Sequence, residues 1–467
     1  MAERAESTAR PLGGLPARLR DSTGLTSLLG RRTASLAVAE GARPFVVAGL
    51  SQLSSRRPIL VVTPTAHDAD RFGSDLAVWL GADRVGVFPA WETLPFERVS
   101  PGVETMGRRL DVLAKLHSAD PPDVVVAPIR AVLQRLGPDA VGVEQLHVAK
   151  GDLVDVGELV ERLVSMGYRR EFQVEHRGEL AVRGGIVDVF PAIADVPVRI
   201  DLWGDEVDRL TEFSVADQRS TNELTQVVVN PARELRPDTS MQRRAEALVG
   251  SEPWGREHWE RVADGQLFDG MESWLPWLVA DEVVLADLLP ADSQVVLVEP
   301  RRLRDRATDV AAEEADLART LAGTWGAVDA SGEPRPFPAL HVGFDRMLEG
   351  CEATVLSIDS TTSGPDGAEV RTVGWEPIAG DSSRLLGQLR DLVSGGGTVL
   401  VAADGVGSGE RLVETLGDEG IPLRQHRDPS TFDGAPGGHV VTLELESGFI
   451  APEAGVAVLT EREITGR

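Results

Sequence analysis

The sequence predicts a multi-domain α/β protein in which a parallel-sheet domain contains a small inserted antiparallel-sheet domain and is followed by a further α/β domain. Three observations predict this class. Apolar runs alternate with amphipathic segments early in the chain, a central stretch alternates apolar and polar residues, and the α/β pattern returns after about residue 338. The 467 residues are enough for about three domains.

The parallel-sheet domain is expected to begin at residue 25. Residues 1–24 carry Pro, Gly and Ser without sustained periodicity, so we expect a flexible leader there. Between residues 25 and 136, apolar runs predict buried strands at 44–49, 58–65, 84–89 and 123–128. Amphipathic segments between them, such as residues 67–80, predict helices, and strands alternating with helices indicate a parallel sheet.

In such a fold, the first strand–loop–helix unit is where a nucleotide would bind. A phosphate-binding loop needs a glycine-rich turn, a lysine for the β- and γ-phosphates and a hydroxyl for magnesium. The candidate, VVAGLSQLSS (46–55), has one glycine and no Gly-Lys-Ser/Thr, and the chain's two lysines, Lys115 and Lys150, are distant in sequence. We therefore expect a degenerate, helicase-like P-loop domain that binds no nucleotide.

The inserted domain is expected over residues 137–231. It opens with an amphipathic helix near 155–166, and a twisted antiparallel sheet follows. Alternate side chains of a strand point to opposite faces. The inward positions are apolar: Leu180, Val182, Val198, Ile200 and Leu202. The outward positions are mostly charged: Glu179, Ala181, Arg183, Arg199 and Asp201. Gly184-Gly185 supplies the flexible backbone of a turn or bulge.

The outward face of this sheet has no catalytic pattern. It holds no His–carboxylate pair with a nucleophile, no cysteine and no cluster of metal ligands. We therefore predict no catalytic residue, no metal and no cofactor for this chain. A solvated sheet face is one interpretation. The other is a docking surface, on which planar guanidinium groups meet a partner's carboxylates.

Residues 232–337 are predicted to be helical and to complete the first domain. Their tryptophans are expected to pack helices together, and residues 301–320 predict an exposed charged helix. A further α/β domain, of unknown function, is expected over residues 338–467. There Gly405, Gly407 and Gly409 follow a predicted strand and precede a helix, as in a dinucleotide-binding turn, but the spacing departs from G-x-G-x-x-G. Because the glycines lie between a predicted strand and a predicted helix, a nucleotide-binding regulator remains an alternative, although the imperfect spacing makes the motif a weak signal.

Composition limits the cellular context and the partners. The formal net charge of −27 disfavours broad DNA binding, because an acidic chain repels the phosphate backbone. No apolar run is long enough to span a bilayer, and no signal pattern opens the chain. The single cysteine, Cys351, fits a reducing compartment. We expect a cytoplasmic protein without a membrane partner.

Two blocks of the inserted domain resemble a known family. GELAVRGGIVDVFPA (178–192) and VRIDLWGDEVDRL (198–210) are similar to the UvrA-interacting domain shared by the excision-repair protein UvrB and the transcription-repair coupling factors. The resemblance implies that UvrA contacts the residues matching that interface: Arg169, Arg183, Phe190, Arg199 and Asp201. For Phe190, a place in the domain core is the alternative. UvrB has a further arginine where this chain has Ala181, so the contact set cannot be identical.

The rest of the chain favours the coupling-factor family over UvrB. Residues 89–116, with Trp91 to Pro95 and Ser100-Pro101, resemble the coupling factors. UvrB has a tyrosine-rich hairpin after this region, whereas Tyr168 is the only tyrosine of this chain. The resemblance covers about residues 25–467 and corresponds to the N-terminal, UvrB-like half of the family.

This resemblance implies a non-catalytic adaptor that recruits UvrA to stalled RNA polymerase. In the family, RNA polymerase and DNA are bound by further domains, ATP and magnesium serve a translocase motor, and a C-terminal domain masks the UvrA-binding surface. No Gly-Lys-Thr or DExH-type motif occurs here, so we expect a truncated chain that ends before the polymerase-binding segment. The alternative hypothesis is an enzyme, a UvrB-like ATPase that verifies DNA damage.

Overall fold

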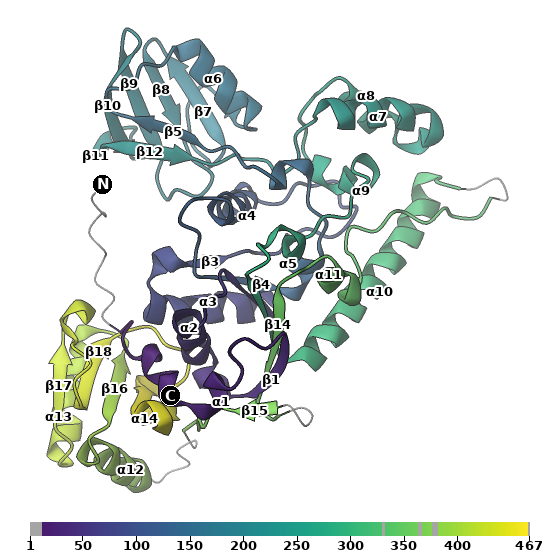
Figure 1. Ribbon diagram of the computed structural model, residues 1–467. Coiled ribbons are helices and arrows are strands. Elements are labelled where there is room, and N and C mark those ends of the chain that lie inside the picture. The colour runs from purple at the N-terminus through teal and green to yellow at the C-terminus, as the bar shows by residue number, and fades with distance from the viewer. Residues whose placement is uncertain (1–11, 329–331, 363–366, 376–381, 466–467) are drawn as a thin grey trace.

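The computed structural model describes residues 12–328, 332–362, 367–375 and 382–465. Its centre is a seven-stranded, all-parallel sheet with the order β15-β1-β14-β13-β2-β4-β3 (Figure 1). Its strands are β1 (Thr33–Ala37), β2 (Ile59–Thr63), β3 (Val85–Val87), β4 (Val124–Pro128), β13 (Gln294–Val298), β14 (Thr354–Asp359) and β15 (Gly367–Glu369). The accompanying helices are α1 (Thr23–Thr26), α2 (Arg43–Leu53), α3 (Ala66–Leu80), α4 (Val103–Leu116), α5 (Ile129–Leu133), α10 (Pro300–Trp325) and α11 (Phe344–Glu349).

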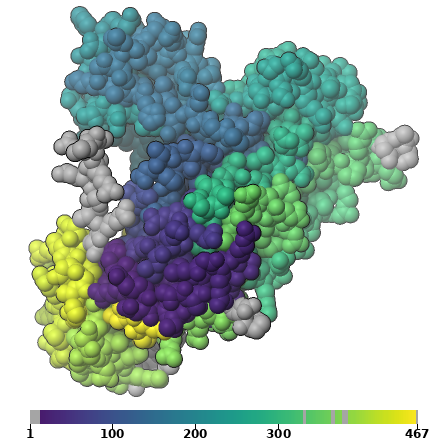
Figure 2. All heavy atoms as spheres, in the orientation of Figure 1, coloured from purple at the N-terminus to yellow at the C-terminus, as the bar shows by residue number. Residues whose placement is uncertain are grey.

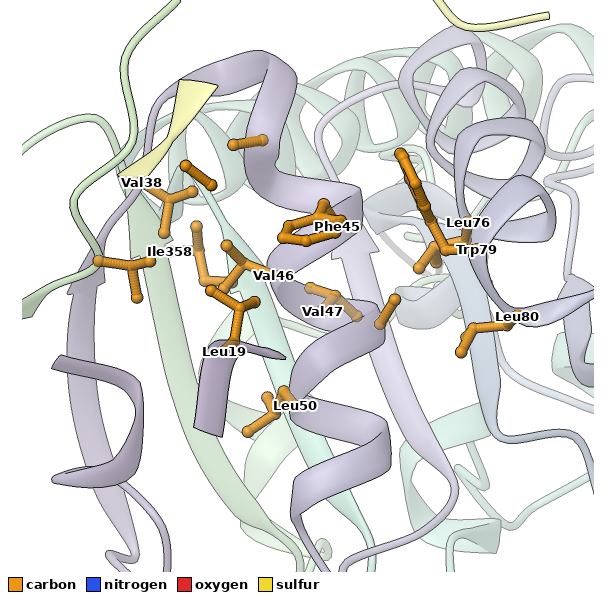
Figure 3. Packing of buried hydrophobic residues seen from close by; sticks show 14 of the residues in the cluster. Leu19, Val38, Phe45, Val46, Val47, Leu50, Leu76, Trp79, Leu80 and Ile358 are labelled. Atoms are coloured by element: carbon orange, nitrogen blue, oxygen red, sulfur yellow. The ribbon is translucent and has the colours of Figure 1, made fainter. Parts of the chain in front are cut away.

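The apolar run at 44–49 forms a helix, so its prediction as a strand is wrong. It lies in α2, where every residue from Arg43 to Ser51 is buried. Figure 3 shows Phe45 and Val47 of this helix in the core that also contains Trp79 of α3. A helix buried all round shows no 3.6-residue alternation of polarity, so composition alone cannot separate it from a buried strand. The other three predicted strands are present as β2, β3 and β4.

Residues 12–24 are packed, which corrects the expectation of a flexible leader for this part. Leu12, Leu15 and Leu19 are at most 1% exposed. Leu15 caps the start of a 3₁₀ helix, η1 (Pro16–Asp21), and Leu19 lies within it. The i, i+3, i+7 spacing of the three leucines is a helical apolar stripe, and it docks against α2. Residues 1–11 lie outside the described part of the chain.

The inserted domain is built on a six-stranded sheet with the order β11-β10-β9-β8-β7-β6 (Figure 1). Neighbouring strands are antiparallel except for the parallel pair β6/β7. Its elements are α6 (Val156–Ser165), β6 (Arg169–Arg170), β7 (Glu179–Arg183), β8 (Ile186–Val189), β9 (Val198–Trp203), β10 (Glu206–Phe213) and β11 (Ser220–Leu224). A separate antiparallel pair, β5 (Leu146–Ala149) with β12 (Gln226–Val229), connects it to the main body.

The helical segment after the insertion forms its own aromatic core. Its helices are α7 (Thr239–Ser251), α8 (Arg256–Ala263) and α9 (Leu275–Leu278). Trp259, Trp274 and Trp277 are buried there and pack edge-on or tilted against one another, which confirms that these tryptophans pack helices. Helix α10 buries one stripe and exposes its charged face.

The C-terminal unit contains a five-stranded sheet with the order β17-β18-β16-β20-β19. Its strands are β16 (Thr398–Ala403), β17 (Leu423–His426), β18 (Gly437–Thr442), β19 (Phe449–Ala451) and β20 (Val456–Thr460), and its helices are α12 (Ser382–Ser394), α13 (Val406–Asp418) and α14 (Glu461–Thr465). The expected domain start at residue 338 differs from the structure, because β14 and β15 pair with β1 in the central sheet. That pairing is non-local, and residues 354–369 carry no local sign of it.

The C-terminal unit shares a core with the N-terminal domain. Phe449 and Val458 belong to the same buried cluster as Phe45 and Trp79, and the Phe45 and Phe449 ring centroids are 5.1 Å apart. Figure 2 shows the purple N-terminal segment lying against the yellow C-terminal unit. Among the described residues, none of the helices combines the length and the apolar composition needed to cross a membrane.

Candidate partner-binding site

The six-stranded sheet has one apolar face, which packs on α6, and one outer face. The apolar face holds the residues predicted to point inward: Leu180, Val182, Val198, Ile200 and Leu202. Strand register arranges the outer face in rows. One row crosses four strands through Arg183, Ile186, Asp201 and Arg209. The next row holds Ala181, Asp188, Arg199 and Thr211.

The centre of the outer face is covered by the domain itself. Arg199 donates from Nε and Nη2 to the two carboxylate oxygens of Asp188, at 2.7 and 2.9 Å. Asp188 is 1% exposed, and the Arg199 guanidinium carbon lies 4.7 Å from the centroid of the Phe213 ring. Such a bidentate pair fixes both side chains. Arg199 is therefore engaged inside the domain.

Phe190 also belongs to the interior. It is 7% exposed and packs with Val174, Ala181 and Phe213. Ala181 was expected to face solvent, but it is 1% exposed because this small cluster covers it. The segment carrying Val174 follows the short strand β6 and folds over the outer face, an arrangement that the period-two pattern could not indicate.

Arg169 and Arg183 are the accessible members of the predicted contact set. The Arg169 side chain is 69% exposed, with Nη2 3.6 Å from Oε1 of Glu179. Arg183 is exposed where β7 ends, and Gly184 beside it has φ +63°, the left-handed conformation that a two-residue hairpin turn requires. The structure thus presents both guanidinium groups on a rigid sheet.

Asp201 lies between the covered centre and the exposed end. It is half-buried and is paired with Ile186 of β8, which is paired in turn with Arg183 of β7. Burial raises the pKa of Asp201, and Arg199 and Arg209 act against that shift. The fold therefore brings Arg183, Asp201 and Arg199 onto one face, places Arg169 at the edge strand, and withdraws Phe190 into the core.

Two exposed apolar side chains at the β9–β10 end of the outer face were not predicted. Trp203 is 84% exposed at the end of β9, and Leu153 is 80% exposed beside β10. The alternation that sends Arg199 and Asp201 outward also sends Trp203 outward, so the signal for this residue was present in the sequence. Leu153 lies in an irregular segment, where no such pattern applies.

The predicted phosphate-loop segment, residues 46–55, lies almost entirely within helix α2, so its prediction as a loop is wrong, and the strand that precedes α2 is β1. Arg43, at the start of α2, donates to Oε1 of Glu299 at 2.9 Å and to Oγ of Ser360 at 3.0 Å. The cavity beside it has a volume of about 70 Å³, whereas ligand pockets of this kind usually measure about 300–1,000 Å³. Five carboxylates line it, against three arginines: Glu40, Asp68, Asp75, Glu299 and Glu446, with Arg43, Arg71 and Arg302.

The glycine turn at 405–409 forms the start of α13. The Ser408 hydroxyl accepts from the Gly405 N–H at 3.1 Å, and the Glu461 carboxylate accepts from the Asp404 N–H at 3.1 Å. A carboxylate that already occupies this helix N-terminus competes with a phosphate for the same positive end. Of the described residues, no group of three or more His, Cys, Asp or Glu is arranged to hold a metal ion.

Comparison with known proteins first defines a class. Residues 146–235 match the family described as the UvrB interaction domain. This range holds β5, α6, the six-stranded sheet and β12. Residues 146–235 are therefore similar to a UvrB interaction domain. Of the predicted contact residues, Arg183, Arg199 and Asp201 lie on its outer face, Arg169 lies on its edge strand, and Phe190 lies in its core.

The relatives of the chain are transcription-repair-coupling factors. It is 33% identical over 450 residues to a transcription-repair-coupling factor of Mycobacterium tuberculosis (89% of this chain and 36% of the relative). It is 27% identical over 448 residues to that of Haemophilus influenzae (92% and 38%), and 25% identical over 461 residues to that of Bacillus subtilis (91% and 38%). Along about nine tenths of its length the chain matches the N-terminal part of a transcription-repair-coupling factor. It spans less than two fifths of the length of these relatives.

Proposed function

We propose that this chain is a non-catalytic adaptor of transcription-coupled nucleotide excision repair that binds UvrA. The observation that carries the proposal is the UvrB interaction domain at residues 146–235, with the exposed Arg183 and Arg169 on its outer face. Its similarity to transcription-repair-coupling factors supports a role in bringing UvrA to stalled RNA polymerase. Contacts with RNA polymerase and DNA, and an ATP-driven motor, would belong to segments outside this chain.

Docking, rather than chemistry, would be the mechanism. Arg183 and Arg169 can offer their guanidinium groups to carboxylates of UvrA, because both side chains reach solvent. Arg199 would support binding indirectly. Its ion pair with Asp188 holds β8 and β9 together in the sheet that carries Arg183. A few residues dominate most interfaces, each costing on the order of 2 kcal/mol or more when truncated. We expect Arg183 to be one of them.

The residues at the place where a phosphate loop would lie support the proposal that this chain uses no nucleotide. In this fold a phosphate loop would lie between β1 and α2, at residues 38–42, and the Arg43–Glu299 ion pair lies directly after this segment. The cavity there measures about 70 Å³, and five carboxylates line it against three arginines. A triphosphate would meet like charge and too little room. A masking domain elsewhere in a longer protein would regulate access to the outer face, as the family resemblance implies.

The test is binding of the chain to purified UvrA, without ATP and at moderate salt, for the wild type and Arg183→Glu. We expect charge reversal to weaken binding about 30-fold or more, because it replaces attraction with repulsion at the contact. Arg162→Glu is the matched control: it makes the same charge change on α6, which covers the opposite face of the sheet. Equal affinities of wild type and Arg183→Glu would contradict a contact at Arg183.

A further inference from the structure

Three side chains form a row at the hairpin end of the outer face. Trp203 in β9 is paired with Glu206 in β10, and Glu206 is bridged on its other side by Leu153. Directly opposed residues of antiparallel strands point to the same face. Leu153, Glu206 and Trp203, called here the hairpin-end row, therefore stand side by side, with the carboxylate between the two apolar groups.

Backbone hydrogen bonds hold the exposed hairpin-end row in place. The Val154 N–H donates to the Asp205 carbonyl at 2.7 Å, and the Val207 N–H donates to the Asp152 carbonyl at 2.9 Å, which fixes the segment carrying Leu153 to β10. Gly204, with φ +64°, allows a two-residue turn directly after Trp203. The row is thus displayed on a hydrogen-bonded scaffold.

Trp203 differs from the other tryptophans of the chain. All nine lie in the described residues, and the other eight are buried or half-buried, whereas Trp203 is 84% exposed. Leu153 in the same row is 80% exposed. Tryptophan is one of the residues enriched at the energetic centres of protein interfaces, where it fills a pocket of the partner.

The row continues the surface assigned to UvrA. Asp201 lies two residues before Trp203 on the same strand and face, and across β8 it is aligned with Arg183. The charges differ along this surface: Arg183 is basic, while Asp205, Glu206 and Asp208 around the row are acidic and exposed. A partner that covers both parts must therefore present acidic groups at one end and basic groups at the other, which fixes its orientation.

We propose that the hairpin-end row is the apolar anchor of the UvrA-docking surface, and that it inserts Trp203 and Leu153 into an apolar recess of UvrA beside a basic side chain that meets Glu206. This inference rests on the proposed function. It makes the exposed Trp203 the aromatic contact with UvrA, in place of Phe190, which is buried.

The experiment compares UvrA affinities of the full chain for the wild type, Trp203→Ala, Leu153→Ala and Glu206→Arg. We expect Trp203→Ala to weaken binding about 30-fold and Leu153→Ala about fivefold. Glu206→Arg should weaken binding more at low salt than at high salt, because screening reduces charge repulsion. The control is Leu94→Ala, which truncates a 53% exposed leucine outside the inserted domain and should leave the affinity unchanged.

A second measurement reports on Trp203 directly. Hydroxyl-radical footprinting of the wild type should show lower oxidation of Trp203 when UvrA is added, with Leu94 unchanged. If Arg183→Glu abolishes binding while Trp203→Ala and Leu153→Ala bind as the wild type does, the anchor is refuted and the adaptor function stands. If the wild type does not bind UvrA, the proposed function fails and the anchor fails with it.

Discussion

Arg199 shows how burial changes the meaning of a residue predicted to contact a partner. Its charge suggests a surface contact, yet its guanidinium is bound by Asp188 and lies over the Phe213 ring. Arg183, two strands away on the same face, is exposed. A loss of UvrA binding would therefore have different causes at the two positions: loss of the fold at Arg199 and loss of a contact at Arg183.

We predict that Arg199→Ala lowers the free energy of unfolding by about 3 kcal/mol, because it leaves the carboxylate of Asp188 buried without its partner. Arg183→Ala should change it by less than about 0.5 kcal/mol, as expected of an exposed side chain. Urea unfolding of the two variants beside the wild type measures both values. Equal stability of Arg199→Ala and wild type would show that the ion pair does not support the sheet.

At the scale of elements, a buried ion pair joins α4 to the chain that leaves the inserted domain. Arg109 of α4 donates from Nε to Oε1 of Glu234 at 2.6 Å, and the same oxygen accepts from Trp91 Nε1 at 3.1 Å. The Arg109 side chain is fully buried, and its guanidinium carbon lies 4.2 Å from the Phe88 ring centroid. This contact fixes where the inserted domain departs from the central sheet.

We predict that Arg109→Met destabilises the protein by about 3–5 kcal/mol, because it strands the carboxylate of Glu234 in the interior. The double variant Arg109→Met/Glu234→Gln should recover more than half of this loss, since an uncharged amide still accepts from Trp91 and leaves no unpaired charge. Thermal and urea unfolding of the single and double variants test this. A double variant less stable than Arg109→Met would refute the explanation.

At the scale of the whole molecule, the C-terminal unit is attached to the N-terminal domain by a titratable contact. Asp75 of α3 accepts from the Glu446 N–H at 3.2 Å, and the Glu446 carboxylate pairs with Arg71 at 3.1 Å. Burial raises the pKa of Asp75 to about 6, assisted by the Glu446 charge and opposed by the Glu446 N–H and by Arg71.

Because the pKa of Asp75 is higher in the folded than in the unfolded state, the folded state binds its proton more tightly. The stability from this group is greatest below about pH 4 and falls as the pH rises to about 6, by up to about 3 kcal/mol. Asp75→Asn keeps the acceptor for Glu446 and removes the charge, so we predict that it stabilises the protein at pH 7.5 but not at pH 4. Unfolding of variant and wild type at the two pH values tests this, and an unchanged difference between them would contradict it.

Sequence patterns determined the features that depend on neighbouring residues. Period-two alternation gave the two faces of β7 and β9, apolar runs gave β2, β3 and β4, and the blocks at 178–192 and 198–210 indicated the UvrB interaction domain that the family comparison matches. Each of these signals is local. The roles of Arg169, Arg183, Phe190, Arg199 and Asp201 in binding remain predictions.

Only the tertiary structure decided features that depend on which surfaces meet. It made α2 a helix inside a core shared with the C-terminal unit, placed β14 and β15 in the central sheet, and buried Phe190 and Ala181 beneath the segment around Val174. It also left Trp203 and Leu153 exposed on either side of Glu206. The physical reason is that burial results from contacts between residues distant in sequence, whereas alternation along a strand shows only the side to which a residue points.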